Sequence, residues 1–185
     1  DTPYVSILGR IWARLFFFSI GWNIEGKLPD IPKFVMIAAP HTSNWDLPIM
    51  LACGFLTRAK LFWMTKDSVF IGPFGVFLRW LGGIPIDRRA THGVVGSMIE
   101  AFNQHDQLLL GITPEGTRSE TKQWHSGFYH IAIGANVPIL PVAFDYGRKE
   151  VRFYPIFRPT GDKETDITHL QSLYQDVKGK FPHSW

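Results

Sequence analysis

The sequence predicts a single α/β domain in which helices flank a mostly parallel or mixed central sheet. Short apolar runs alternate along the chain with helical stretches of about ten residues, which is the pattern of strand–helix units. The 185 residues are enough to bury one hydrophobic core. There are no repeats, low-complexity tracts or long linkers, and Pro and Gly fall at expected element ends, as at 29–32 and 82–83. We therefore expect one domain over 22–185, preceded by a short segment over 1–21.

That first segment has the pattern of an amphipathic helix. From Tyr4 to Trp22, apolar and aromatic residues recur at helical spacing, and Arg10 and Arg14 lie one turn apart. About 20 uninterrupted apolar residues are needed to span a bilayer, and the two arginines break the run. We expect residues 1–21 to lie at a membrane interface, with aromatic side chains in the acyl boundary and arginines among the headgroups. Packing on the domain's own core is the alternative, and one helix can do both.

The remaining elements follow from hydrophobic periodicity. Strands are expected at residues 34–39, 61–65, 84–86, 108–112, 139–144 and 151–155. Helices are expected at residues 43–56, 74–81, 92–103, 127–134 and 166–178.

Composition narrows the class of partner. Aromatic residues make up 15% of the chain, which favours contact with lipid or another apolar partner. The net charge is only +3 and no run of Lys or Arg exists, so a nucleic-acid partner is not expected. The single cysteine, Cys53, has apolar neighbours and is expected to be a buried core thiol. The histidines show no ligand spacing, so no metal site is expected.

Residues 39–46, Ala-Pro-His-Thr-Ser-Asn-Trp-Asp, follow an apolar strand and open a helix. Chemistry in α/β sheets gathers where strands meet loops and helix N-termini. If the chain turns between His41 and Asp46, the carboxylate can bond one ring nitrogen and leave the other to accept a proton. No covalent nucleophile stands out, so His41 is expected to be a general base. The alternative is that Ser43 and Asp46 form only a capping box at the helix start.

A second segment, residues 112–119 (Ile-Thr-Pro-Glu-Gly-Thr-Arg-Ser), follows the strand at 108–112. Gly116 allows the backbone to approach a ligand, and Thr117 and Arg118 supply donors. This combination suits an anion such as phosphate. An ordinary Pro-x-Gly turn is the alternative.

Taken together, these residues resemble the glycerolipid acyltransferase family, which includes glycerol-3-phosphate and 1-acylglycerol-3-phosphate (lysophosphatidate) acyltransferases. The His41-x4-Asp46 pair and the block at 114–119 resemble its first and third motifs. Residues 83–88 (Gly-Ile-Pro-Ile-Asp-Arg) resemble the second, and 137–141 (Val-Pro-Ile-Leu-Pro) the fourth. The four motifs occur in the family's order within residues 22–144.

The resemblance implies roles for individual residues. His41 would be the base, Asp46 its orienting partner and Arg88 a ligand of the acceptor phosphate. The acceptor headgroup would be lined by Glu115, Gly116, Thr117 and Arg118. Acyl-CoA or acyl-carrier protein would be the donor and a lysolipid the acceptor, with no cofactor and no metal. The enzyme would act in phospholipid biosynthesis, associated peripherally with the cytoplasmic face of a membrane.

Several positions depart from the family's pattern. Pro40 stands where members usually have Asn, and Thr113 replaces an aromatic or aliphatic residue. After the third motif, where many members place lysines, only Lys122 is close, which weakens the case for a strongly phosphate-directed acceptor. Two other functions remain open: a catalytically idle lipid- or acyl-carrier-binding module on the same fold, and a metal-dependent hydrolase using His41, Asp46 and Glu115. For the hydrolase, a second suitably spaced histidine is lacking.

Overall fold

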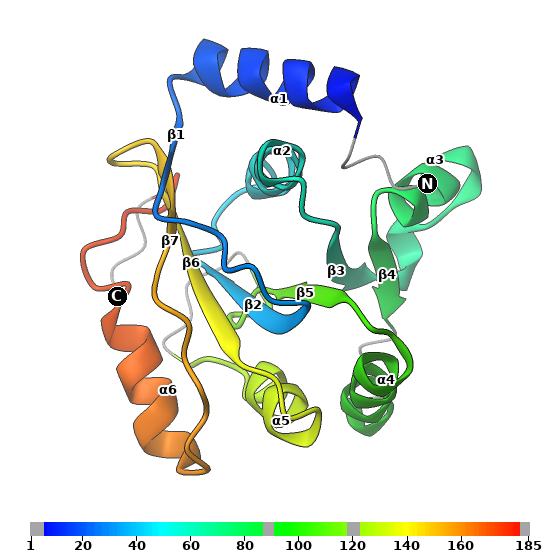
Figure 1. Cartoon of the computed structure of the whole chain (residues 1–185), viewed down its shortest axis with the longest axis vertical. Coiled ribbons are helices and arrows are strands. Elements are labelled where there is room, and N and C mark those ends of the chain that lie inside the picture. The colour runs from blue at the N-terminus through cyan, green and yellow to red at the C-terminus, as the bar shows by residue number, and fades with distance from the viewer. Residues whose placement is uncertain (1–5, 87–90, 118–122, 182–185) are drawn as a thin grey trace.

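The computed structural model describes residues 6–86, 91–117 and 123–181, and shows a seven-stranded mixed sheet with helices on both faces (Figure 1). The strands are β1 (Asn23–Glu25), β2 (Lys33–Ala39), β3 (Leu61–Lys66), β4 (Gly83–Ile86), β5 (Leu108–Ile112), β6 (Ile139–Asp145) and β7 (Glu150–Phe153). The helices are α1 (Ile7–Ile20), α2 (Asp46–Thr57), α3 (Gly72–Trp80), α4 (Thr91–Gln104), α5 (Gly127–Gly134) and α6 (Lys163–Ser172), with a 3₁₀ turn η2 (Asp67–Val69). The predicted α/β class is confirmed.

The strand order is β1-β7-β6-β2-β5-β3-β4, with β2 at the centre. Every neighbouring pair is parallel except β6 and β7, which are joined by a tight turn and run antiparallel. The central strands β5, β2 and β6 all run the same way, so their carboxyl ends meet at one edge of the sheet. In open parallel sheets this edge is where ligands bind.

The core lies in two layers, one on each face of the sheet. Side chains alternate along β2 because successive residues of a strand point to opposite faces: Phe34, Met36 and Ala38 pack in the cluster under α1 and α2. Val35, Ile37 and Ala39 pack on the opposite face, in the cluster that includes residues of α4, α5 and α6. Figure 1 shows α1 lying outside α2, so that one face of the sheet carries an extra helical layer.

Three element predictions need correction. β1 was not expected, because Asn23-Ile24-Glu25 has a single apolar residue, and it forms only by pairing with β7. The helix predicted at 43–56 begins at Asp46 instead, because residues 40–45 form a loop. The last helix begins at Lys163 rather than 166, because the Asp162 side chain caps its first turn by accepting from the Thr165 amide at 3.2 Å. It ends at Ser172 rather than 178, and turns follow.

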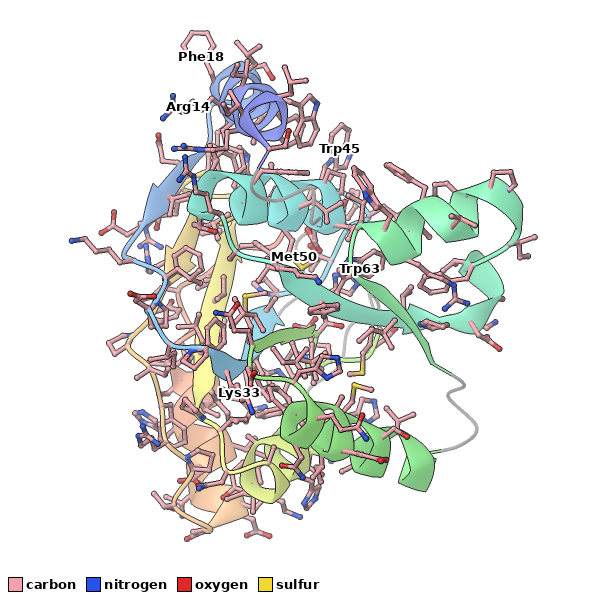
Figure 2. The ribbon with its side chains drawn as sticks, turned by 45° about the vertical axis from the view of Figure 1, so that its right-hand side comes forward. Arg14, Phe18, Lys33, Trp45, Met50 and Trp63 are labelled. Atoms are coloured by element: carbon pink, nitrogen blue, oxygen red, sulfur yellow. The ribbon has the colours of Figure 1, made fainter. Side chains whose placement is uncertain are left out.

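Helix α1 has one face on the protein and one face in solvent. Ala13 and Phe17 are buried, and Phe55 of α2 packs so closely on Gly9 that a Cβ there would lie 2.5 Å from its ring. The outer face exposes the large apolar residues Ile7, Leu8, Ile11, Trp12, Leu15 and Phe18. Figure 2 shows Phe18 on the side of α1 away from the sheet and Arg14 at the flank of the helix. Packing on the core is therefore realised, and it leaves an apolar stripe uncovered.

A second exposed apolar surface belongs to α3 and the residue before it. Its members are Ile71, Phe74, Val76, Phe77 and Trp80. Among the helices that the structure describes, none is long and apolar enough to cross a membrane.

Candidate functional site

Three parallel strands bring the site residues together. His41 follows the end of β2, Glu115 follows β5, and Tyr146 comes directly after β6. Because β2 pairs with both β5 and β6 in parallel, these positions meet at one edge of the sheet although they lie up to 105 residues apart in sequence. The first two were predicted from the sequence, and Tyr146 was not.

The His41 and Asp46 side chains form a close pair. Nδ1 of His41 lies 2.9 Å from Oδ2 of Asp46. The Asp46 side chain is buried at 3% exposure, whereas His41 keeps 22%. A carboxylate on Nδ1 favours the tautomer that carries its proton there, which leaves Nε2 able to accept a proton.

The same carboxylate also closes the loop between the two residues. Oδ2 of Asp46 accepts hydrogen bonds from the backbone amides of Thr42 and Ser43, each at 3.1 Å. The capping box at Ser43, set out above as the alternative, is not formed at the helix start: α2 begins at Asp46, and its N-cap residue Trp45 makes no side-chain capping bond. The Asp46 oxygen bonds the imidazole and two amides of the preceding loop instead. The loop turns back around this oxygen, so two residues five apart meet although a continuous helix would place them on different faces.

Glu115 contacts His41 through the backbone. Its Oε2 accepts a 2.7 Å hydrogen bond from the His41 amide, and Glu115 is buried at 5% exposure. A hydrogen bond that ends on a carboxylate is stronger than a neutral one. The geometry therefore makes Glu115 a support for His41, and its expected contact with an acceptor headgroup stays a prediction.

The turn after Glu115 requires glycine. Gly116 has φ of 64°, and a Cβ there would lie 2.8 Å from the His125 ring. The His125 amide donates to the Pro114 carbonyl at 2.8 Å. The closeness of His125 to this turn could not be inferred from the spacing of residues in the sequence. Thr117 is exposed beside this turn. Arg88 and Arg118, predicted as phosphate ligands, lie outside the described residues, as does Lys122.

Beside the His41–Asp46 pair lies a cavity of about 620 Å³. Its polar wall includes His41, Ser43, Asn44, Asp46 and Thr117. Its apolar wall includes Leu47, Met50, Trp63, Val69, Phe74 and Leu78. Figure 2 shows Met50 of α2 and Trp63 of β3 between that helix and the sheet. The pocket thus joins a polar end, which carries the His41–Asp46 pair, to a lining suited to hydrocarbon.

Lys178 and Lys180 contact Tyr146 and the loop between β2 and α2, respectively. The Lys180 amide donates to Oγ1 of Thr42 at 2.9 Å, and the Lys178 carbonyl accepts from the Tyr146 amide at 2.8 Å. The Lys180 ammonium lies 4.8 Å from the centre of the Trp45 ring, a cation–π contact. Figure 2 shows Trp45 on the side of the molecule that α1 occupies.

The thiol of Cys53 is buried in α2, as expected from its neighbours. Burial raises its pKa to about 12, which keeps it protonated and unreactive at ordinary pH. In the part of the chain that the structure describes, no three His, Cys, Asp or Glu side chains are grouped so as to hold a metal ion.

Comparison with known proteins agrees with these features. The family model described as Acyltransferase matches residues 23–145. The 1-acyl-sn-glycerol-3-phosphate acyltransferase of Haemophilus influenzae is 29% identical over 148 residues, covering 75% of this chain and 60% of that protein. The enzyme of the same name from Streptococcus pneumoniae is 31% identical over 134 residues, covering 66% of this chain and 49% of its own. The chain thus spans about 60% or less of the length of these relatives.

A solved structure shares the fold. The crystal structure of the 1-acyl-sn-glycerophosphate (LPA) acyltransferase PlsC from Thermotoga maritima superposes with a TM-score of 0.64 at 19% identity, covering 89% of this chain and 74% of that one. The family match includes the segments that carry all four motifs, from His41 to Pro141. The resemblance drawn from those motifs is therefore confirmed, and the chain belongs to the acyltransferase family.

Proposed function

We propose that this protein transfers a fatty acyl group from a thioester donor, acyl-CoA or acyl-carrier protein, to a hydroxyl of a lysolipid or glycerol-phosphate acceptor. The observation that carries the proposal is the His41–Asp46 pair, 2.9 Å apart, at the polar end of a cavity with an apolar wall. The names of the curated relatives support a 1-acylglycerol-3-phosphate acceptor.

In the proposed reaction His41 acts as the general base. Nε2 of His41 takes the proton of the acceptor hydroxyl while its oxygen attacks the thioester carbonyl carbon. The C–O bond forms, the C–S bond breaks, and the proton passes from His41 to the departing thiolate, so charge and protons balance. Asp46 holds the ring and stabilises the imidazolium between these steps. A thioester is already activated, so no covalent enzyme intermediate and no cofactor are required.

The two walls of the cavity would divide the substrates. The acyl chain of the donor would lie along the apolar wall formed by α2, β3 and α3, where it leaves water. The acceptor headgroup would lie at the polar end, where Gly116 and Thr117 reach the cavity. Arg88 and Arg118 are the proposed ligands of the acceptor phosphate, because a guanidinium grips phosphate with two parallel hydrogen bonds.

The exposed stripe of α1 supports a location on a membrane surface. An interfacial helix binds through its buried apolar area and through attraction of its cations to anionic lipid, and α1 offers an apolar face together with Arg14. We place the protein peripherally on the cytoplasmic face, where it would take lysolipid from the bilayer.

The test is His41→Ala, assayed by thiol release from acyl-CoA and by mass spectrometry of a lysolipid panel. Loss of a general base lowers kcat by roughly 10²–10⁴-fold, and Asp46→Asn is expected to cost less or a comparable amount. His105→Ala is the matched control, because that histidine is exposed at the end of α4. If wild type binds acyl-CoA but releases no thiol, the idle binding module is correct. A folded His41→Ala protein with full turnover would refute His41 as the base.

A further inference from the structure

The carboxylate of Asp46 receives its hydrogen bonds very unevenly. Oδ2 is contacted by the His41 ring and by two backbone amides, at 2.9 to 3.1 Å. Oδ1 accepts a hydrogen bond from the hydroxyl of Tyr146 at 2.6 Å. The shortest contact to this buried carboxylate therefore comes from a residue 100 positions away in the chain.

Tyr146 is itself firmly held. It follows directly on β6, and its amide donates to the Lys178 carbonyl at 2.8 Å. Its ring packs edge-on against Trp22, with ring centres 4.8 Å apart and planes at 82°. Backbone and ring are both fixed, so the hydroxyl is presented to Asp46 from a rigid support.

The hydroxyl acts as the donor in this bond. Burial, together with the hydrogen bond to Asp46 and its negative charge, raises the pKa of Tyr146 well above its usual range. The Tyr146 hydroxyl therefore keeps its proton at the pH values at which enzymes are usually assayed, and Asp46 accepts the hydrogen bond.

We propose that Tyr146 is a positioning residue of the acyltransferase site, which fixes the plane of the Asp46 carboxylate so that Oδ2 stays on Nδ1 of His41. The terminal torsion of an aspartate is soft, with broad wells. Three donors on one oxygen leave the carboxylate free to pivot about that oxygen, and a bond to the other oxygen stops the pivot. The inference rests on the proposed function, because it assigns Tyr146 a task only if His41 is the base.

Tyr146 would act through Asp46 and not through the substrate. It is not among the described residues that line the cavity, whereas His41 and Asp46 are. Removing its hydroxyl is thus expected to change kcat and leave the KM values for donor and acceptor nearly unchanged.

The decisive variant is Tyr146→Phe, which keeps the ring against Trp22 and removes only the hydroxyl. We expect kcat to fall roughly 10- to 100-fold, up to the 10²-fold that a misplacement of about 1 Å can cost. The matched control is Tyr154→Phe, whose hydroxyl makes a bond of the same length, 2.6 Å, to the Leu173 carbonyl. The control is expected to keep wild-type kcat.

A pH profile separates positioning from a merely structural role. The hydroxyl draws negative charge away from the imidazole, so its loss stabilises the imidazolium and moves the acidic limb of kcat/KM to higher pH. Other titratable groups near the loop are Glu115, bonded to the His41 amide, and Lys180, bonded through its amide to Thr42. Both are unchanged in the variant. A loss of packing alone would lower the melting temperature and leave that limb in place.

A double-mutant cycle with Asp46→Asn supplies the second readout. If Tyr146 acts through Asp46, then adding Tyr146→Phe to Asp46→Asn costs much less than adding it to wild type. Independent, multiplicative losses would overturn the inference, and so would a wild-type kcat and pH profile in Tyr146→Phe. His41→Ala is measured alongside: if it is inactive while Tyr146→Phe is normal, only the tyrosine inference fails. If His41→Ala is fully active, the proposed base fails, and the role of Tyr146 with it.

Discussion

Replacing Glu115 by Gln distinguishes two proposed roles for this residue, support of the His41 backbone and contact with the acceptor. The carboxylate accepts from the His41 amide at 2.7 Å in a buried position. A hydrogen bond to a charged group contributes about 1.5–3 kcal/mol and a neutral one about 0.5–1.5 kcal/mol. Gln keeps an acceptor oxygen and loses the charge, so we expect the free energy of unfolding to drop by about 1–1.5 kcal/mol.

That loss predicts both a thermal and a kinetic change. For a domain of this size 1 kcal/mol corresponds to about 2–4 °C in Tm, so Glu115→Gln should melt about 2–6 °C below wild type. A less well held His41 backbone should lower kcat about tenfold, well within the roughly 10²-fold cost of a 1 Å misplacement. KM for the acceptor should stay close to that of wild type.

The assay combines calorimetry with thiol-release kinetics at varied acceptor concentration. Glu25→Gln, an exposed change on β1, is the matched control and should alter neither quantity. The reasoning is refuted if Glu115→Gln melts like wild type and raises KM for the acceptor tenfold with unchanged kcat. That result would make Glu115 a headgroup ligand, as the family resemblance implies.

The remaining predictions concern substrates, membrane and thiol. Arg88→Ala should raise KM for a phosphate-bearing acceptor about 10- to 150-fold, the equivalent of 1.5–3 kcal/mol, with little change in KM for the donor. The KM of Arg88→Lys should fall between those of wild type and Arg88→Ala. Unchanged kinetics in Arg88→Ala would indicate that the preferred acceptor carries no phosphate. The double change Leu15→Gln with Phe18→Gln, on the exposed side of α1, should weaken co-sedimentation with anionic vesicles. Turnover of a short-chain soluble acceptor should stay intact. If the variant binds vesicles as well as wild type, the apolar stripe of α1 contacts a partner other than the membrane. Met50→Trp should narrow the cavity and shift kcat/KM toward shorter acyl donors, and an unshifted preference would place the chain elsewhere. Cys53, with its pKa raised to about 12, should resist alkylation in the native protein at pH 8.5 and react once it is unfolded, whereas rapid native labelling would contradict its burial.

Much of the fold could be predicted because its strands are short apolar runs with ends marked by Pro, Gly or polar residues. The failures arose where tertiary contacts override local pattern. β1 has one apolar residue and depends on its neighbour β7 for pairing. The start of α2 moved to Asp46 because the preceding loop wraps around that carboxylate.

In the candidate site, too, local contacts could be predicted from the sequence and long-range contacts could not. The His41–Asp46 contact spans five residues, so local spacing was enough to suggest it. The supports of that pair come from Glu115 and Tyr146, which lie 74 and 100 residues away from their partners. Only the adjacency of β2, β5 and β6 brings them together, and one sequence carries no direct signal of strand order.

The long-range contacts that hold the loop between β2 and α2 have a consequence for when this region folds during synthesis. Asp46 and Thr42 are synthesised before the groups that bond them: the Tyr146 hydroxyl follows Asp46 by 100 residues, and the Lys180 amide follows Thr42 by 138. Chains emerge from the ribosome N-terminus first, and contacts between distant segments form only after long loops have closed. A nascent chain thus contains both His41 and Asp46 long before the contacts that orient their side chains can form. Activity should therefore appear abruptly, when the last fifth of the described chain has emerged and folded back onto the sheet edge.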